Sequence, residues 1–227
     1  MHIKTGYFVT GIGTAVGKTT VTLALMHYLR QQGYVVAGMK PVAAGCEWRE
    51  ERWQNADAEL IRLHSCLNLD YGLINPYAFA MPLSPHIACG DTEVNLQTIL
   101  QAYAEINQTA DLIVVEGAGG WLSPLSASLD NAALAIAMQL PVIVVVGMYL
   151  GCINHARLTL QALQQSGLAC AGWVAVEIEA DRVDVDANIA YLQQILTPPL
   201  LARLPYQAVA DYSVLAACFN KVQLAEF

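Results

Sequence analysis

Short apolar runs alternate along the chain with longer segments in which apolar residues recur at helical spacing. The apolar runs lie near residues 6–10, 34–39, 112–116, 142–146, 172–176 and 199–204. The helical segments lie between most of them, at 18–32, 56–66, 95–109, 130–139, 154–166 and 185–196. This alternation predicts an α/β fold with a mostly parallel twisted sheet and helices on both of its faces. Because ligands of such sheets bind at the carboxyl ends of the strands, functional residues are expected in the loops that follow them.

The composition predicts one domain with a large core. No repeat, low-complexity tract or linker interrupts residues 1–227, and 56% of the residues are hydrophobic while only 13% are charged. The net charge of −8 argues against nonspecific nucleic-acid binding, which depends on Lys and Arg. Six cysteines are scattered without a C-x-x-C motif, which predicts free, mostly buried thiols in a reducing cytosol.

A stretch without charged residues, 131–154, is long enough to suggest a membrane helix. Gln139 and Pro141 interrupt it, and the β-branched run 142–146 that follows is typical of a strand buried on both faces. Residues 1–4 lead directly into the first apolar run and leave no room for a signal peptide. We therefore expect a cytoplasmic protein that binds neither membrane nor nucleic acid.

A glycine-rich turn follows the first apolar run, with the sequence Gly-Ile-Gly-Thr-Ala-Val-Gly-Lys-Thr-Thr at residues 11–20. Such a strand–turn–helix can wrap backbone N–H groups around a polyphosphate at a helix N-terminus, where the helix dipole favours anions. Lys18 would reach the β- and γ-phosphates, and the hydroxyl of Thr19 is placed for Mg²⁺. The usual spacing G-x-x-x-x-G-K-[ST] puts its first glycine at Ile12, so that motif is not matched in full. The alternative is a glycine-rich connection with a solvated lysine.

Charged residues follow two further strands and open one helix. Lys40, after the second apolar run, could bridge the γ-phosphate and an anionic substrate, or could be an exposed lysine. Glu116 ends the third run, before the glycine-rich segment 117–120, where a Walker-B-like carboxylate would hold Mg²⁺ directly or through water. Asp57 could be a second Mg²⁺ carboxylate, or an acidic residue favoured by the helix dipole.

Two later segments have less specific patterns. Residues 151–154 open a helix after the fourth run, and backbone N–H groups there can bind an anion. Cys152 and His155 lie three residues apart at this helix start, where a buried thiol is expected rather than a nucleophile pair. The proline-containing loop 71–91 is long enough to be a lid or binding loop, or a stiff surface excursion.

Together these segments resemble the dethiobiotin synthetase family, and the match runs nearly end to end. The family's phosphate loop has the same lengthened spacing as the turn described above. The resemblance is carried by Val9–Gly11, Val16–Thr19, Lys40–Val42, Asn55–Asp57, Ser84–His86, Val115–Gly120, Pro124–Leu125, Leu150–His155 and Gly172–Val174.

The resemblance implies a P-loop NTPase fold and a ligase of biotin biosynthesis. Its substrates would be 7,8-diaminopelargonic acid, CO₂ and ATP, with Mg²⁺ as cofactor. One amine would take up CO₂ as a carbamate, which would attack the γ-phosphate to give a carbamic–phosphoric anhydride. The second amine would then close the ureido ring of dethiobiotin. The family also implies a homodimer with the substrate at the interface.

The resemblance also implies a role for each matching residue. Lys18 and Lys40 would be catalytic, and Thr19, Asp57 and Glu116 would hold Mg²⁺. Nucleotide contacts are implied for Gly13, Thr14, Ala15, Val16, Gly17, Lys18, Thr19, Thr20, Asp57, Glu116, Gly117, Ala118, Gly119, Val176, Glu177, Pro205 and Tyr206. Substrate contacts are implied for Thr14, Lys40 and Ala44, and for Gly151, Cys152, Ile153 and Asn154 of the partner subunit.

Three positions depart from the family pattern, and three other functions compete with the one that the resemblance implies. Ala44 stands where many relatives have a hydroxyl residue, Ala15 where some have an acidic one, and Val176 where an adenine-contacting Asn is expected. Ala44 and Val176 therefore leave a low-activity paralogue as an alternative. An amidoligase of the cobyrinic acid a,c-diamide synthase type would need a glutaminase domain, for which there is no room. An ATPase of the MinD/ParA kind would have a lysine at the position that Gly13 occupies here, so the loop departs from that class.

Overall fold

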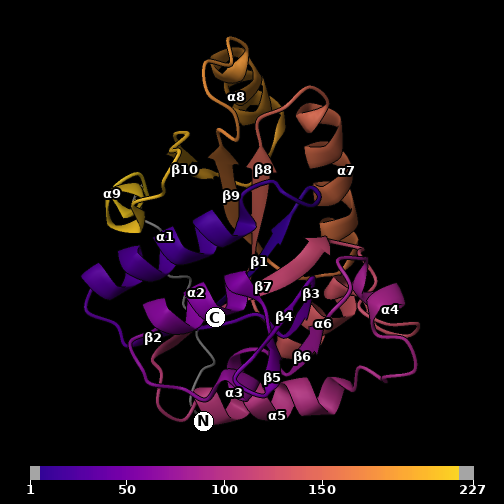
Figure 1. Ribbon diagram of the computed structural model, residues 1–227. Helices are drawn as coiled ribbons and strands as arrows, with labels where there is room; N and C mark the ends of the chain where they lie inside the picture. Colours follow the sequence, from indigo (N-terminus) through magenta and orange to yellow (C-terminus); the bar gives the residue numbers. More distant parts are fainter. Residues whose placement is uncertain (1–5, 220–227) are drawn as a thin grey trace.

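A six-stranded sheet forms the centre of the protein, whose computed structural model describes residues 6–219 (Figure 1). Its strands are hydrogen-bonded in the order β10-β9-β8-β1-β7-β2, and every neighbouring pair is parallel. The six predicted strands are all present, so the predicted parallel sheet is confirmed. Residues 1–4, on which the expectation about a signal peptide depends, lie outside the described part. The strands are β1 (Gly6–Gly11), β2 (Val36–Met39), β7 (Leu112–Gly120), β8 (Val142–Gly147), β9 (Cys170–Val176) and β10 (Leu200–Leu204).

The helices follow the predicted segments closely and cover the sheet from two sides. The chain moves from β1 to β2 in one direction along the sheet and from β8 to β10 in the other. Because parallel crossovers are right-handed, α1 and α7 lie on opposite faces. The predicted helices are α1 (Lys18–Gln31), α2 (Ala56–His64), α5 (Leu96–Ile106), α6 (Asn131–Met138), α7 (Cys152–Gln165) and α8 (Val185–Ile195).

The expected long loop at 71–91 is wrong, because this segment contains two short helices and a strand. These elements are too short to show a periodic pattern in the sequence. The strand β6 pairs in parallel with β3, and β4 and β5 form an antiparallel hairpin. The short elements are β3 (Val42–Ala44), β4 (Glu47–Arg49), β5 (Arg52–Gln54), α3 (Tyr71–Ile74), β6 (Tyr77–Phe79), α4 (Pro85–Ala88) and α9 (Tyr212–Ala216).

The apolar run 142–146 is strand β8, and its residues are 0% exposed. The expectation of a strand buried on both faces is therefore confirmed. Within residues 6–219, no helix is long and apolar enough to cross a membrane. All six cysteines are free, as expected, but only Cys46, Cys89 and Cys152 are buried.

The strand register brings Lys40 and Glu116 next to each other. Val9 of β1 lies opposite Glu116, and Met39 of β2 lies opposite the residue before it. Lys40, the residue after Met39, therefore reaches the same edge of the sheet. Glu116 does not end its strand as predicted, because the glycines that follow stay extended along β1 up to Gly120.

Candidate active site

The glycine-rich turn between β1 and α1 has the backbone geometry that the sequence predicts for a phosphate-binding loop. Gly17 precedes the first residue of α1 and has a φ of 90°, a conformation that favours glycine. A Cβ on Gly11 would lie 2.6 Å from the Val16 side chain, so the turn can close only over a glycine there. Ile12, at the position of the usual first glycine, donates its N–H to the carbonyl of Val145 at 3.0 Å. The backbone at Ile12 is therefore hydrogen-bonded to β8, as the end of β1 is.

Lys18 is folded back over this turn. Its ammonium donates a hydrogen bond of 2.7 Å to the carbonyl of Gly13, and the residue is 8% exposed. Burial lowers the pKa of Lys18 to about 8, and Lys40 also lowers it, whereas Glu116 raises it. A buried cation whose hydrogen-bond partner is a neutral carbonyl is well placed to gain from an arriving phosphate.

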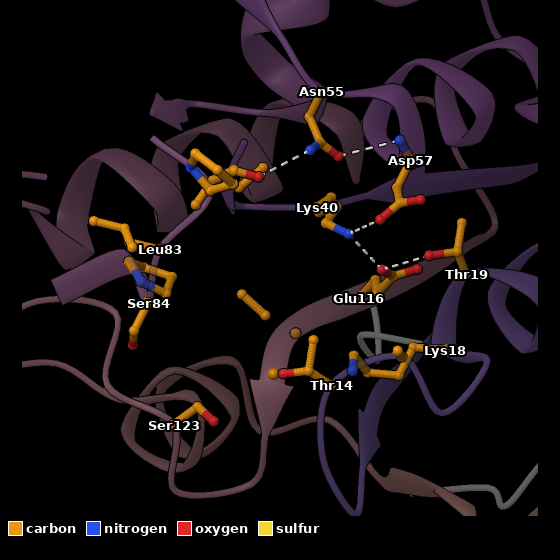
Figure 2. A pocket seen from close by; sticks show the side chains of 18 of the residues that line it. Thr14, Lys18, Thr19, Lys40, Asn55, Asp57, Leu83, Ser84, Glu116 and Ser123 are labelled. Carbon is orange, nitrogen blue, oxygen red and sulfur yellow. Dashed lines mark hydrogen bonds and ion pairs between the residues drawn. The ribbon is translucent and has the colours of Figure 1, made fainter. Parts of the chain in front are cut away.

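Lys40 lies between two carboxylates, as Figure 2 shows. Its Nζ is 2.5 Å from Oδ2 of Asp57 and 2.7 Å from Oε1 of Glu116. Burial by itself lowers the pKa of Lys40, but the carboxylates of Glu116 and Asp57 raise it to about 12. The residue is only 7% exposed, so the alternative of an exposed lysine is wrong.

Asp57 is placed by the cap of helix α2. Oδ1 of Asn55 accepts the N–H groups of Asp57 at 3.1 Å and of Ala58 at 3.3 Å, and its amide nitrogen donates to the carbonyl of Ala44. Asp57 therefore lies in the first turn of a helix and also faces Lys40. Its place in the first turn agrees with the helix-dipole interpretation, while its role as a second Mg²⁺ carboxylate stays a prediction.

Glu116 offers a buried oxygen that fits a divalent cation. Its Oε1 accepts hydrogen bonds from Lys40 and, at 3.0 Å, from the hydroxyl of Thr19. Its Oε2 has no hydrogen-bond partner among the described residues, although Glu116 is only 1% exposed. Leaving a buried carboxylate oxygen unpaired is costly, and a cation or its bound water would remove that cost.

The donors around this oxygen suit Mg²⁺ in particular. Thr19, Asp57 and Glu116 offer hard oxygen atoms, and Mg²⁺ is usually held by one or two carboxylates together with substrate phosphates. No group of three or more His, Cys, Asp or Glu residues that could hold a metal occurs in the part of the chain that the structure describes. The residues present therefore fit an ion that phosphate oxygens help to bind, rather than a metal caged by the protein.

These groups line one end of a cavity of about 820 Å³, which is large enough for a substrate beside a triphosphate. Figure 2 shows Leu83 and Ser84 on the side opposite Lys18 and Lys40. The predicted site residues that line it are Thr14, Ala15, Gly17, Lys18, Thr19, Thr20, Lys40, Ala44, Asp57, Glu116, Gly117, Ala118 and Gly119. Gly13 takes part through its carbonyl, and Val16 is buried beneath the turn.

The residues predicted around the nucleotide base do not line this cavity. Val176 and Glu177 lie at the carboxyl end of β9, with Pro205 and Tyr206 just after β10. A Cβ on Gly17 would lie 2.8 Å from the Val176 side chain, so this valine packs directly against the phosphate turn. Glu177 is held by Arg203, whose Nε donates to its Oε1 at 2.7 Å. The base contacts stay a prediction.

The helix start at 151–154 also lies outside the cavity lining. Cys152 is 1% exposed, and its N–H donates to the carbonyl of Tyr149 at 3.0 Å. His155 bonds through Nδ1 to the hydroxyl of Tyr149 at 2.7 Å, so it is not paired with the thiol. A buried thiol was expected here and is confirmed. The contribution of 151–154 to a partner's site stays a prediction.

Asn131 and Ser123 were not among the predicted site residues, although they hold the glycine-rich segment of β7 in place. Asn131 is fully buried, and its amide bonds both the N–H and the carbonyl of Ala118 and the carbonyl of Gly120. Ser123 accepts the N–H of Gly120 at 2.7 Å. The one signal for Asn131 was an amide directly after a capping aspartate, Asp130, at the start of an alanine-rich helix.

A parallel α/β sheet, a lysine-bearing glycine turn after its first strand and a buried carboxylate on the neighbouring strand define a P-loop nucleotide-binding protein. The family model described as an AAA domain matches residues 5–212. The chain is 46% identical over 207 residues to the ATP-dependent dethiobiotin synthetase BioD of Xanthomonas axonopodis pv. citri, covering 90% of this chain and 92% of that protein. It is 47% identical over 213 residues to the BioD of Nitrosospira multiformis, covering 93% and 92%. The chain belongs to the ATP-dependent dethiobiotin synthetase family.

Solved structures of P-loop proteins share the fold at low sequence identity. Cobyrinic acid a,c-diamide synthase from Mycobacterium smegmatis, solved with ADP and magnesium, has a TM-score of 0.56 at 13% identity over 94% of this chain and 91% of that one. The signal recognition particle receptor FtsY from Elizabethkingia anophelis, in complex with GDP, has a TM-score of 0.52 at 16% identity over 99% of this chain. The chain spans 63% of that FtsY chain. These likenesses support the fold alone.

Proposed function

We propose that this protein is an ATP- and Mg²⁺-dependent dethiobiotin synthetase, a ligase of biotin biosynthesis. Its substrates are 7,8-diaminopelargonic acid and CO₂, and its product is dethiobiotin. One observation carries the proposal: a buried lysine lies between two carboxylates beside a phosphate turn, in a chain that belongs to this family. This arrangement is suited to joining an anionic substrate to a terminal phosphate.

The phosphate end of the site supplies charge without a protein nucleophile. Lys18 and Lys40 contribute two positive charges, which Asp57 and Glu116 balance before a ligand arrives. Bound Mg²⁺ would supply positive charge that offsets the negative charge developing during phosphoryl transfer. Thr19, Asp57 and Glu116 would hold it. Catalysis then comes from positioning and electrostatic stabilisation.

The proposed reaction proceeds in three steps. A neutral amine of the substrate adds to CO₂ and releases a proton, which leaves a carbamate. A carbamate oxygen attacks the γ-phosphorus and displaces ADP, giving a carbamic–phosphoric anhydride. The second amine then attacks the carbamoyl carbon, loses a proton and expels phosphate, which closes the ring. Lys40 is placed to stabilise the carbamate and the phosphoryl group together.

Further parts of the proposal concern the assembly of the protein and its nucleotide. We propose one domain, a cytoplasmic location and a homodimer in which residues 151–154 of one subunit bind the substrate carboxylate of the other. Backbone N–H groups at a helix N-terminus can bind such an anion.

The side chain of Val176 cannot hydrogen-bond a base, so we propose that the nucleotide is held mainly by its phosphates and by packing of the base against Tyr206.

The test is product formation by the purified protein with diaminopelargonate, bicarbonate and Mg-ATP. We expect dethiobiotin, detected by mass spectrometry, and one phosphate released per ring closed. Leaving out any one substrate should abolish phosphate release. Phosphate release that does not require the diamine would instead favour a partner-binding ATPase of the MinD/ParA kind. Replacing ATP by CTP or GTP in the same assay measures the base preference.

A further inference from the structure

A serine–histidine pair lies on the cavity wall opposite the phosphate turn. Ser84 lines the cavity, and its Oγ lies 2.8 Å from Nδ1 of His86. Figure 2 places Ser84 and its neighbour Leu83 across the cavity from Lys18 and Lys40. The phosphate chemistry described above uses neither Ser84 nor His86, so the pair has no role in it.

Ser84 precedes helix α4 but does not use its side chain to cap it. Its carbonyl accepts the N–H groups of Ile87 at 2.8 Å and Ala88 at 3.0 Å, while its hydroxyl makes no capping hydrogen bond. A serine at this position usually accepts a backbone N–H with its hydroxyl oxygen. Here the Ser84 hydroxyl is hydrogen-bonded to the His86 ring instead, and it still faces the cavity.

The position of Ser84 relative to Lys40 is fixed by backbone contacts. The strand that follows Lys40, β3, pairs with β6, which leads to Ser84. The N–H of Gly45 donates to the carbonyl of Met81 at 3.0 Å. A Cβ on Gly45 would lie 3.3 Å from the ring of Pro82, so the two segments are in close contact. The wall that carries Ser84 is therefore built into the sheet region.

The other polar side chains on this part of the lining are committed to the protein. Asn55 caps α2 and also bonds the chain after β3, and Ser123 accepts a backbone N–H. The remaining lining there is apolar, with Ala43, Ala44, Leu83 and Pro85. A hydroxyl has one donor and two acceptor positions, so its bond to His86 leaves Ser84 with capacity for a ligand.

We infer that Ser84 contacts the substrate amine that closes the ring, and that His86 is a positioning residue that orients the Ser84 hydroxyl. This inference rests on the proposed function. An attacking amine must be neutral, and a free carboxylate beside it would favour the ammonium form. Both carboxylates of the site lie beside Lys40, across the cavity from Ser84, as Figure 2 shows. The Ser84 hydroxyl oxygen can accept an N–H of the amine, which leaves the lone pair of the amine nitrogen free to attack. The hydroxyl proton is donated to Nδ1 of His86.

Four variants test this contact in the dethiobiotin assay, with KM for the diamine and for Mg-ATP measured separately. For Ser84→Ala we expect kcat/KM for the diamine to fall about 10- to 100-fold, as for loss of one hydrogen bond in the transition state. KM for Mg-ATP should stay within about 2-fold, because Ser84 is across the cavity from the phosphate turn. His86→Ala should show a smaller loss, and His86→Asn should recover most of it, because its Oδ1 can accept the hydroxyl proton. Ser213→Ala, at an exposed serine of α9, is the matched control.

Each contrary result has a distinct meaning. Ser84→Ala with unchanged diamine kinetics would overturn the contact. Equal losses for His86→Ala and His86→Asn would overturn the positioning role, since both would then reflect damage to α4. Wild-type protein that makes no dethiobiotin would refute the proposed function, and the inference with it, before any variant is compared.

Discussion

Lys40 is buried between two carboxylates, so its charge is held in place before any ligand arrives. The sequence predicted its position after β2 but left open whether it was exposed, because most lysines are. Whether Lys40 is buried or exposed depends on the strand register, which places Lys40 beside Glu116. A register between distant segments cannot be read from one local pattern. The same is true of Asn131, whose partners lie in β7.

Replacing Lys40 by alanine should remove charge stabilisation at the carbamate and γ-phosphoryl group. We expect kcat to fall about 10²- to 10³-fold, which is the usual effect of losing one such group. Nucleotide affinity should fall much less, because Lys18 and the turn remain. Steady-state kinetics and titration with a non-hydrolysable ATP analogue measure the two effects. Equal losses in turnover and affinity would show that the role of Lys40 is misassigned.

At the scale of elements, the sequence predicted the long helices and central strands but not the short ones. Helices such as α1 and α7 extend over several turns, so their apolar positions repeat often enough to be recognised. Strands β3 and β6 have three residues each, and they form only because they pair with each other. Ala44 is the last residue of β3, and β6 leads to Ser84. The side of the cavity formed by these segments was therefore the part of the site that the sequence predicted least.

A contact between three helices makes stability depend on pH. Nε2 of His27 on α1 lies 2.8 Å from Nδ1 of His64 on α2, and Tyr212 of α9 packs against both rings. Burial lowers the pKa of both histidines below the ordinary value of 6.5; Arg30 lowers both further, and Asp211 raises that of His27. The folded protein therefore binds fewer protons than the unfolded chain, so stability is complete above about pH 7.5 and falls as the pH drops through 6.5.

The measurement is Tm between pH 7.5 and pH 5.5. In the double variant His27→Gln and His64→Gln, the acid-induced loss of Tm should be smaller by about 2 °C, a modest value because both rings are partly exposed. His155→Gln, at an exposed histidine on α7, should leave the loss unchanged. An undiminished loss in the double variant would show that other groups cause the acid sensitivity.

At the scale of the whole molecule, the fold was predicted well because its signals are repeated along the chain. Six strands and six helices each add a local indication of the same α/β alternation. How two copies of the chain meet depends on surface shape, for which no local pattern exists. Leu150 is 87% exposed and directly precedes residues 151–154, which the proposed dimer places at the interface.

A charge at that position should weaken the proposed dimer. For Leu150→Glu we expect a shift toward monomer in light scattering after gel filtration, together with a higher KM for the diamine. Val183→Glu is the matched control, because Val183 is 99% exposed in the loop before α8. If Leu150→Glu stays dimeric with normal kinetics, the interface lies elsewhere.

The ion pairs of Lys40 with Asp57 and Glu116 also explain how the site can exist before it is filled. Without an internal counterion, two carboxylates at the sheet edge would repel each other and draw in water or push the helix and strand apart. The ammonium of Lys40 attracts both carboxylates and so offsets their repulsion, which lets the empty enzyme keep the spacing that a metal–nucleotide complex requires. Because Lys40 and both carboxylates already lie together at the phosphate turn, less free energy is needed to position them when that complex arrives.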